Sequence, residues 1–192
     1  MGSDALLDLF RKSGALLDGH FRLSSGLHSS GYLQCALVLQ HPDSAETLGR
    51  ALAERLRDLR PTVVLSPALG GLIIGHEVGR ALGVRAIFAE RQDGEMTLRR
   101  GFTLGEHDRV VVVEDVLTTG GSTRETIQVA RAAGGQVIGA GAIVNRSGKA
   151  PELELPFRAV LDVPLPTYEP ERCPLCAQGL PVLKPGSRPV LT

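Results

Sequence analysis

Two adjacent carboxylates, Glu114 and Asp115, follow a run of four valines, and a turn rich in hydroxyl groups and glycine comes directly after them. The segment 110–123 reads VVVVEDVLTTGGST. The valine run is typical of a buried parallel strand. The turn would open a helix, where backbone N–H groups and hydroxyls favour an anion. Because carboxylates can accept hydrogen bonds from vicinal ribose hydroxyls while the loop binds a phosphate, the segment predicts a sugar-phosphate site.

A purely structural turn is the alternative interpretation, because Gly and Thr are common at strand-to-helix junctions of α/β proteins. The segment matches neither a Walker A loop, which requires a lysine, nor the GxGxxG fingerprint. The acid pair argues against a mere turn. Two carboxylates at the end of an apolar strand cost desolvation and mutual repulsion, which a structural junction has no reason to accept.

Composition predicts a cytoplasmic protein with one domain. The 192 residues suffice for a substantial core, and 21 acidic residues balance 21 basic ones. This zero net charge implies no general attraction to nucleic acid or to an anionic membrane. No apolar run approaches the roughly 18 residues of a membrane span, and the amino terminus shows no basic stretch followed by a hydrophobic signal region. The basic residues are mostly arginines, which suit fork-like contacts to phosphate.

Cysteine and histidine spacing indicates no dedicated protein metal site. Cys173 and Cys176 form a CxxC pair, but no second CxxC or HxxxH completes a four-ligand set. We therefore expect packed or surface thiols, with a redox disulfide or an intersubunit metal as less favoured alternatives. The five histidines are interpreted as surface or packing residues, although His28 could approach an anionic ligand.

The order of predicted elements favours a mainly parallel sheet flanked by helices. An amphipathic helix over 4–13, with Asp4 able to cap it, precedes a Ser- and Gly-rich hairpin over 19–34. Further elements are then expected, namely helices over 42–59, 72–82 and 122–133, and strands over 62–66, 85–89, from 109, and over 136–144. Prolines recur after residue 164, which predicts an extended tail. The whole chain 1–192 is thus one domain, with an amino-terminal part of about 1–40, a core of about 41–163 and a tail of about 164–192.

Four loops are expected at one edge of this sheet, because ligands of open α/β sheets collect at the carboxyl ends of the strands. They are 66–71, 90–91, 114–122 and 145–146. The first reads SPALGG, whose glycines allow a backbone to approach an anion closely, although a simple turn explains it equally well.

Several segments together resemble the orotate phosphoribosyltransferases, which are type I phosphoribosyltransferases. The segment EDVLTTGGST is similar to their phosphoribosyl pyrophosphate (PRPP) motif. The hood segment SSGLHSSGYLQ, the loop SPALGG, the stretch FAERQDGEMTLRRGF, the segment VNRSG and the tail PTYEPERCPLCAQGLPVLKPGSR extend the similarity over nearly the whole chain. The resemblance implies the type I fold, with a small amino-terminal hood, and transfer of ribose 5-phosphate from PRPP to orotate, which gives orotidine 5′-phosphate and pyrophosphate in pyrimidine synthesis.

The resemblance also implies roles for individual residues. Catalytic roles fall to Asp115, Glu114, Arg99 and Arg100. Orotate would contact Thr118 and Arg146, and an arginine fork does match a carboxylate. PRPP would be bound by Glu114, Asp115, Val116, Leu117, Thr118, Thr119, Gly120, Gly121, Ser122, Arg91, Leu69 and Gly70. Magnesium would arrive with PRPP, because Mg²⁺ prefers oxygen ligands and bridges phosphates.

The polar connection 90–105 resembles the family's mobile flap, which completes the site of a neighbouring subunit. We therefore expect a homodimer with shared sites. Two other functions remain as alternatives, a purine phosphoribosyltransferase and a non-catalytic regulator that senses nucleotides and binds nucleic acid. The second would require a basic face. A patch formed by Arg50, Arg55, Arg57 and Arg60 is conceivable, although a solvated helix face explains these arginines better.

Overall fold

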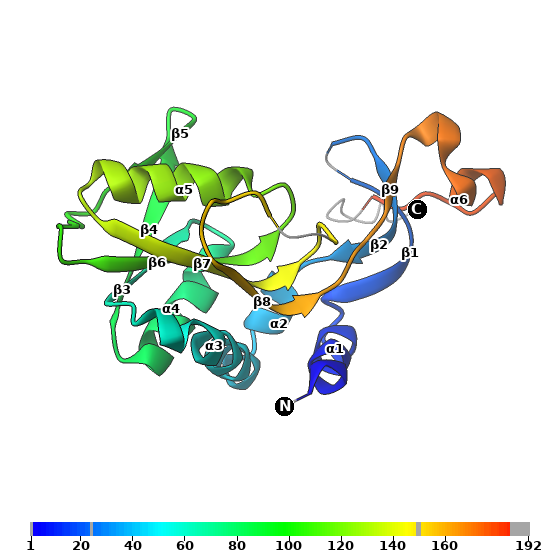
Figure 1. The fold of residues 1–192 in the computed structure, drawn as a ribbon. Helices are drawn as coiled ribbons and strands as arrows, with labels where there is room; N and C mark the ends of the chain where they lie inside the picture. The colour runs from blue at the N-terminus through cyan, green and yellow to red at the C-terminus, as the bar shows by residue number, and fades with distance from the viewer. Residues whose placement is uncertain (1, 24, 149–150, 185–192) are drawn as a thin grey trace.

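A computed structural model describes residues 2–23, 25–148 and 151–184 of the chain. Two sheets organise it (Figure 1). The larger sheet has six strands in the order β5-β4-β3-β6-β7-β8, and the smaller has three in the order β1-β2-β9. No helix among the described residues is long and apolar enough to cross a membrane.

The six-stranded sheet is parallel except at one edge, where β5 runs antiparallel to β4. Its strands are β3 (Val63–Pro67), β4 (Arg85–Gln92), β5 (Glu95–Leu98), β6 (Arg109–Leu117), β7 (Gln136–Asn145) and β8 (Phe157–Asp162). Because the parallel strands share one direction, their carboxyl ends all reach the same rim. The expected mainly parallel sheet flanked by helices is confirmed.

Helices cover both faces of this sheet. Helices α3 (Pro42–Leu56) and α4 (Gly71–Leu82) pack together on one face, and α5 (Gly121–Ala132) covers the other. The valines of β6 serve both faces in turn. Val111 and Val113 belong to the core cluster with α3 and α4, whereas Val112 packs in the cluster with α5. This alternation, which follows from the two-residue period of a strand, sets the directions of the next side chains on β6.

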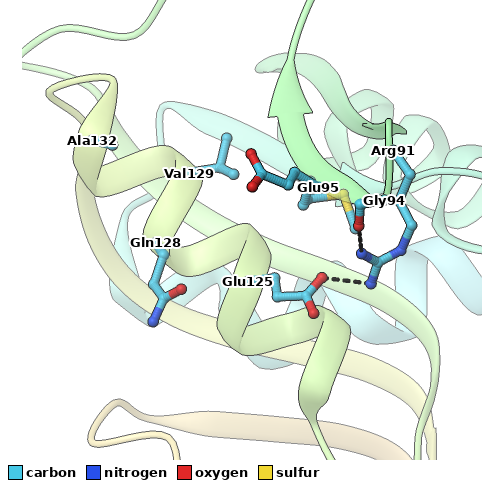
Figure 2. A pocket seen from close by; sticks show the side chains of 8 residues that line it. Arg91, Gly94, Glu95, Glu125, Gln128, Val129 and Ala132 are labelled. Atoms are coloured by element: carbon cyan, nitrogen blue, oxygen red, sulfur yellow. Dashed lines mark hydrogen bonds and ion pairs between the residues drawn. The ribbon is translucent and has the colours of Figure 1, made fainter.

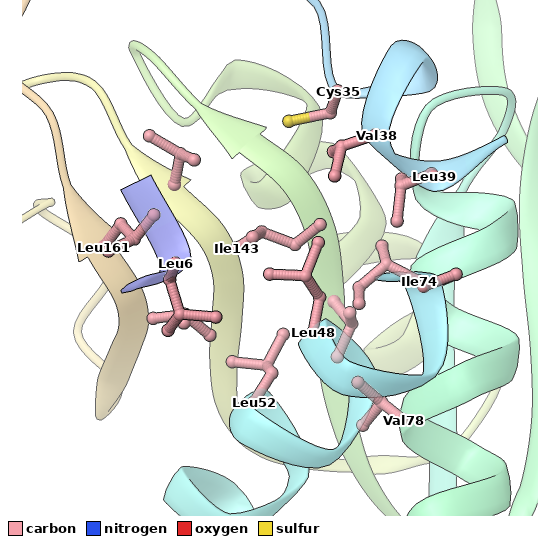
Figure 3. Close-up of a cluster of buried hydrophobic side chains, with 14 of the residues drawn as sticks. Leu6, Cys35, Val38, Leu39, Leu48, Leu52, Ile74, Val78, Ile143 and Leu161 are labelled. Atoms are coloured by element: carbon pink, nitrogen blue, oxygen red, sulfur yellow. The ribbon is translucent and has the colours of Figure 1, made fainter. Parts of the chain in front are cut away.

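The larger core cluster joins the sheet to the amino-terminal part of the chain (Figure 3). Leu48 and Leu52 from α3, with Ile74 from α4, pack against Ile143 of β7. Leu6 from α1 (Ser3–Lys12) completes the cluster from the side of β8. All these side chains are almost fully buried, so the amino-terminal helix is part of the main core.

The small sheet forms the hood and takes its third strand from the tail. Strands β1 (Leu16–Arg22) and β2 (His28–Leu33) form an antiparallel hairpin, and β9 (Thr167–Tyr168) pairs with β2. The short α2 (Ala36–Leu39) leads from the hood into the core. After β9 come the 3-10 helix η2 (Pro170–Arg172) and α6 (Pro174–Ala177), which lie beside β1 and β2 in Figure 1. The tail is therefore an integral part of the hood.

Local differences from the sequence predictions have clear causes. Gly2 occupies the cap position of α1 without a side-chain bond, so Asp4 does not cap the helix but lies in its first turn. There it still favours the positive helix end. The helix predicted over 42–59 ends at Leu56 and continues as the 3-10 helix η1 (Arg57–Leu59), because Arg60 adopts a left-handed conformation. Strands β5 and β8 were not predicted, since their sequences lack strong alternation.

Candidate active site

The acid pair at the end of β6 points to opposite faces of the sheet. Glu114 continues the side of Val112 and accepts a hydrogen bond from the hydroxyl of Thr123, in the first turn of α5. Burial is the main cause that raises the pKa of Glu114 to about 7, and the negative charges of Asp115 and Glu125 add to it. Desolvation thus exceeds mutual repulsion as the cost of this carboxylate.

Asp115 continues the side of Val113 and lies against the loop that precedes α4. A Cβ added to Gly70 would lie 2.7 Å from Oδ1 of Asp115, so only glycine leaves room for the carboxylate in this position. The backbone N–H of Val116 donates to the same oxygen at 2.9 Å. Burial raises the pKa of Asp115 above its ordinary value. The loop at the end of β3 and the acid pair are therefore in direct contact.

The loop after β6 encloses a small polar pocket at the rim of the sheet. Its volume is about 220 Å³. The described residues that line it are Arg91, Glu114, Val116, Thr118, Thr119, Gly120, Gly121, Ser122 and Glu125. Gly120 has a φ of 75°, a conformation that favours glycine, and it turns the chain into α5. Backbone N–H groups at the start of this helix can bind an anion, so the pocket suits a phosphate.

Arg91 borders this pocket and a second, larger one beside it (Figure 2). Its guanidinium contacts Glu125 of α5 at 2.5 Å and donates to the carbonyl of Gly94 at 2.6 Å. The second pocket, of about 410 Å³, lies between the β4–β5 hairpin and α5. Glu125 thus holds Arg91 next to the loop after β6, where its positive charge can reach an anion.

Arg146 follows β7 and lies beside the same loop. Its backbone N–H donates to the carbonyl of Leu117 at 2.8 Å, which brings it next to Thr118. The side chain is half-buried, and burial lowers the pKa of the guanidinium. Its Nη2 atom is buried and has no hydrogen-bond partner among the described residues. A buried donor without a partner is costly, so this nitrogen is suited to an acceptor on a ligand.

The flap residues Arg99 and Arg100 lie apart from the pocket after β6. Arg100 forms a two-pronged contact with Glu90, at 2.8 Å and 3.0 Å, and Arg99 lies 3.7 Å from the same carboxylate. Both arginines are exposed. Within one chain, therefore, neither arginine faces the acid pair across the pocket.

Comparison with known proteins agrees with this geometry. The family model of the phosphoribosyl transferase domain matches residues 36–164. The orotate phosphoribosyltransferase of Pelotomaculum thermopropionicum is 54% identical over 99% of this chain and 100% of its own length. That of Heliobacterium modesticaldum is 55% identical over 98% of this chain and 100% of its own. The chain belongs to the orotate phosphoribosyltransferase family.

A solved structure of the family also resembles the chain. The crystal structure of the Mycobacterium tuberculosis H37Rv orotate phosphoribosyltransferase in complex with PRPP is 27% identical and superposes with a TM-score of 0.65, covering 83% of this chain and 94% of that one. The fold, the enzyme class of pentosyltransferase and the family predicted from the sequence are thus confirmed.

Eight of the fifteen residues predicted for the phosphoribosyltransferase site line the pocket after β6, and seven do not. The seven are Leu69, Gly70, Arg99, Arg100, Asp115, Leu117 and Arg146. The side chain of Leu117 is buried in the core with Ile127, so it does not line the pocket. Leu69 projects outward, 83% exposed, from a loop with a cis peptide bond after Ala68. Asp115 does not line this pocket and lies against Gly70, in the loop at the end of β3.

Sequence reasoning missed three polar partners. Thr123 bonds Glu114, Glu125 holds Arg91, and Glu90 pairs with the flap arginines. The contacts of Thr123 and Glu125 could have been predicted from the helix that follows β6, because residues in the first turns of α5 face the end of the preceding strand. Thr123 already stood at the end of the motif TTGGST.

Proposed function

We propose that this chain binds PRPP and orotate at the rim of its central sheet and joins them to form orotidine 5′-phosphate and pyrophosphate. One arrangement carries the proposal. A buried acid, a glycine-bounded loop at a helix amino terminus and a buried guanidinium nitrogen without a partner meet at the ends of β6 and β7. The three groups match a ribose, a phosphate and a carboxylate, respectively.

The phosphate of PRPP would occupy the pocket after β6. Thr118, Thr119 and Ser122 supply hydroxyls there, and Gly120 and Gly121 leave their N–H groups accessible. Arg91 adds a positive charge at the edge of the pocket. The loop and Arg91 thus offer N–H groups, hydroxyls and a positive charge to a phosphate monoester.

The ribose would lie over the acid pair. Glu114 and Asp115 can accept hydrogen bonds from its hydroxyls when they are ionised. As the bond to pyrophosphate breaks, the sugar gains positive character, which two nearby carboxylates stabilise. Orotate is already an anion, so catalysis needs positioning and electrostatic stabilisation and no covalent nucleophile.

Orotate would be recognised by Arg146 and Thr118. The unpartnered Nη2 of Arg146 can donate to the carboxylate of orotate, which a purine base lacks. Purine substrates would leave this buried donor unsatisfied, so the site disfavours them.

Magnesium would enter with PRPP as part of the substrate. The acid pair offers oxygen donors only, the ligand type that Mg²⁺ prefers, so the residues at the rim fit such a complex. We assign no resident metal to this pocket.

A homodimer with shared sites explains the position of the flap. Arg99 and Arg100 are exposed on the β4–β5 side of the sheet and pair only with Glu90 among the described residues. A positive charge is needed where pyrophosphate departs. The flap of a second subunit can supply it if the two chains associate through this region.

The remaining alternative, a regulator that binds nucleic acid, finds little support on α3. Arg50 of α3 is paired with Glu46 of the same helix at 2.6 Å, and Arg57 of η1 with Glu54 of α3 at 3.2 Å, so two of the four arginines of the conceivable patch are paired with acids. The three cysteines of the chain are free thiols. We propose that the enzyme acts in the cytoplasm, whose reducing conditions keep thiols free.

The decisive test is turnover. The purified chain should convert orotate and PRPP, with Mg²⁺ present, into orotidine 5′-phosphate and pyrophosphate, both followed by chromatography. Adenine, hypoxanthine and guanine serve as competing bases. Formation of a purine nucleotide without turnover of orotate would contradict the proposal, as would salt-sensitive binding of nucleic acid with no turnover of any base.

A further inference from the structure

Four potential metal ligands from distant parts of the sequence meet between the hood and the tail. They are His20 of β1, His28 of β2, Cys173 before α6 and Cys176 within α6. One ligand atom from each lies within 4.8 Å of all the others. His20, His28 and Cys173 are buried, while Cys176 reaches the surface. We call these four residues the His/Cys cluster.

The distances within the His/Cys cluster fit a tetrahedral metal. Zinc bonds of about 2.0–2.1 Å to nitrogen and 2.3 Å to sulfur, at tetrahedral angles, separate neighbouring ligand atoms by roughly 3.3–3.8 Å. Nε2 of His20 lies 3.4 Å from Sγ of Cys173 and 3.7 Å from Sγ of Cys176. Nδ1 of His28 lies 3.3 Å from the same Cys176 sulfur. The two ring nitrogens are closer, at 2.9 Å. The two remaining pairs of ligand atoms lie within 4.8 Å of each other. Metal binding would therefore move the two ring nitrogens apart and draw any longer pair together.

The surroundings orient the ligands as in known zinc sites. The other ring nitrogen of His20, Nδ1, lies 2.9 Å from the carbonyl oxygen of Leu180. A metal-bound histidine usually donates its second N–H to such a carbonyl, which leaves the facing nitrogen free to coordinate. Cys173 and Cys176 are three residues apart on one turn, closed by a hydrogen bond from the N–H of Ala177 to the carbonyl of Cys173 at 3.2 Å. This is the cysteine spacing of structural zinc sites.

Packing alone does not account for the cluster. Two imidazoles and two thiols lie close together around one point, and the two rings share only one hydrogen bond. Both thiols are free. A coordinated metal deprotonates such a thiol outright.

We infer that the His/Cys cluster is a structural zinc site that fastens the tail to the hood. Four protein ligands close the coordination sphere, which distinguishes a structural zinc from a catalytic one. Backbone bonds already join the two parts, since Leu183 donates to His20 and Arg22 donates to Leu183, each at 2.8 Å. Zinc would add a second attachment, which links the segment of η2 and α6 to strands β1 and β2. The inference is independent of the substrate proposal, because none of the four ligands lines the pocket after β6.

The sequence prediction of no dedicated metal site thus missed a discontinuous ligand set. Each half is inconspicuous alone: a CxxC pair in the tail, and two histidines eight residues apart in the hood. The pairing of β9 with β2 and the backbone bonds of Leu183 to β1 bring the halves together. His28, which could have approached an anionic ligand, instead faces His20 and Cys176.

The first experiment measures zinc by elemental analysis. The full chain is reconstituted with zinc under reducing conditions and freed of excess metal. We expect about one zinc per chain, and the same in the control variant His41→Asn/His76→Asn, which removes two exposed imidazoles outside the cluster. The variant His20→Asn/His28→Asn should retain less than about a tenth of that amount. A chelator should lower the melting temperature of the wild type and leave that of the cluster variant unchanged.

A second measurement uses the wild type alone, in case the cluster variant fails to fold. Cobalt(II) added to the metal-free chain should give the intense visible bands of a tetrahedral site and the near-ultraviolet band of thiolate coordination. Zinc should then displace the cobalt and remove both. The inference is overturned if the reduced, folded wild type binds neither metal, if thiol bands are absent, or if the cluster variant keeps its zinc. A Cys173–Cys176 disulfide that forms readily in a chain that binds no metal when reduced would support the redox alternative instead.

Discussion

Gly70 and Asp115 are in such close contact that a methyl group on Gly70 would lie 2.7 Å from the Asp115 carboxylate oxygen. The loop after β3 and the strand β6 are thus coupled through one side chain. The backbone of Gly70 is ordinary, with a φ of −57° and a ψ of −39°, so alanine would suit its conformation. The steric requirement for glycine therefore concerns the position of the Asp115 carboxylate and not the backbone conformation of Gly70.

We predict that Gly70→Ala lowers kcat/KM for PRPP at least about tenfold, which corresponds to ~1.4 kcal/mol. The added methyl group displaces the Asp115 carboxylate, while the fold is retained because the end of a side chain can move. Gly105→Ala is the matched control, as a Cβ there meets no atom within 4 Å. Steady-state kinetics and thermal melting should show lost activity at nearly unchanged stability for Gly70→Ala alone. Equal kinetics for both variants would contradict the proposed role of the contact.

The contact between Gly70 and Asp115 could not be predicted from the sequence, although the strand, the acid pair and the helix start around it could. The valines, the acid pair and TTGGST predicted a strand, a site and a helix start, because each signal is local. The opposite directions of Glu114 and Asp115 also follow from the period of a strand. The approach of Gly70 to Asp115 depends on β3 lying beside β6, and this strand order is set by packing over the whole sheet.

Partners from exposed loops were harder to predict than the strand end. The pairing of Glu90 with Arg99 and Arg100 depends on the turn between β4 and β5, whose polar sequence shows no strand signal. Likewise, the tail was predicted as an extended segment, and nothing in its prolines indicates that two residues would pair with β2. Contacts between segments that are distant in the sequence leave no periodic pattern, so they cannot be predicted from the sequence of either segment.

Asp115→Asn should lower turnover at least about tenfold while the chain remains folded. Asparagine keeps the size of the side chain and an oxygen for the N–H of Val116, but it removes the negative charge that stabilises a cationic ribose. The loss should therefore fall on kcat more than on the KM for PRPP. Circular dichroism and steady-state kinetics test this together. Turnover equal to that of the wild type in the folded variant would show that the charge is not needed.

Glu114 should make stability depend on pH. Its pKa is raised to about 7 in the folded chain, against about 4.3 in an unfolded one. Between these values the folded state binds more protons, so the free energy of unfolding falls as pH rises, by roughly 4 kcal/mol in all. Glu114→Gln lacks this proton and should gain stability relative to the wild type over the same range. Denaturant melts at several pH values measure the difference, and parallel curves for the two proteins would refute the assignment.

Arg146→Ala should raise the KM for orotate at least about tenfold and change the KM for PRPP little. The variant removes the buried Nη2 donor that has no partner among the described residues. Arg146→Lys should not restore binding, because an ammonium lacks the planar fork of a guanidinium. Arg131→Ala, at the exposed end of α5, is the control for loss of a positive charge. If the KM values for both substrates rise together, Arg146 acts on the whole site and not on orotate.

The last prediction concerns the sharing of sites between two subunits. Asp115→Asn damages the acid pair, and Arg99→Ala/Arg100→Ala damages the flap, which within one chain contacts Glu90 and does not line the pocket. When the two impaired proteins exchange subunits, a mixed dimer has one site with an intact acid pair and an intact flap. Activity should therefore rise well above that of either parent.

The matched control mixes Asp115→Asn with Arg146→Ala. Both changes leave the flap intact and damage the part of the site that each chain builds itself, so every mixed dimer keeps a defect in each site and activity should not recover. Exchange is verified in both mixtures by mass spectrometry of the intact dimers. Recovery in the first mixture only is the result expected of shared sites. If exchange is complete and neither mixture recovers, each chain uses its own flap. Every site is then built from a single subunit and keeps the defect of that subunit, either in the flap or in the acid pair.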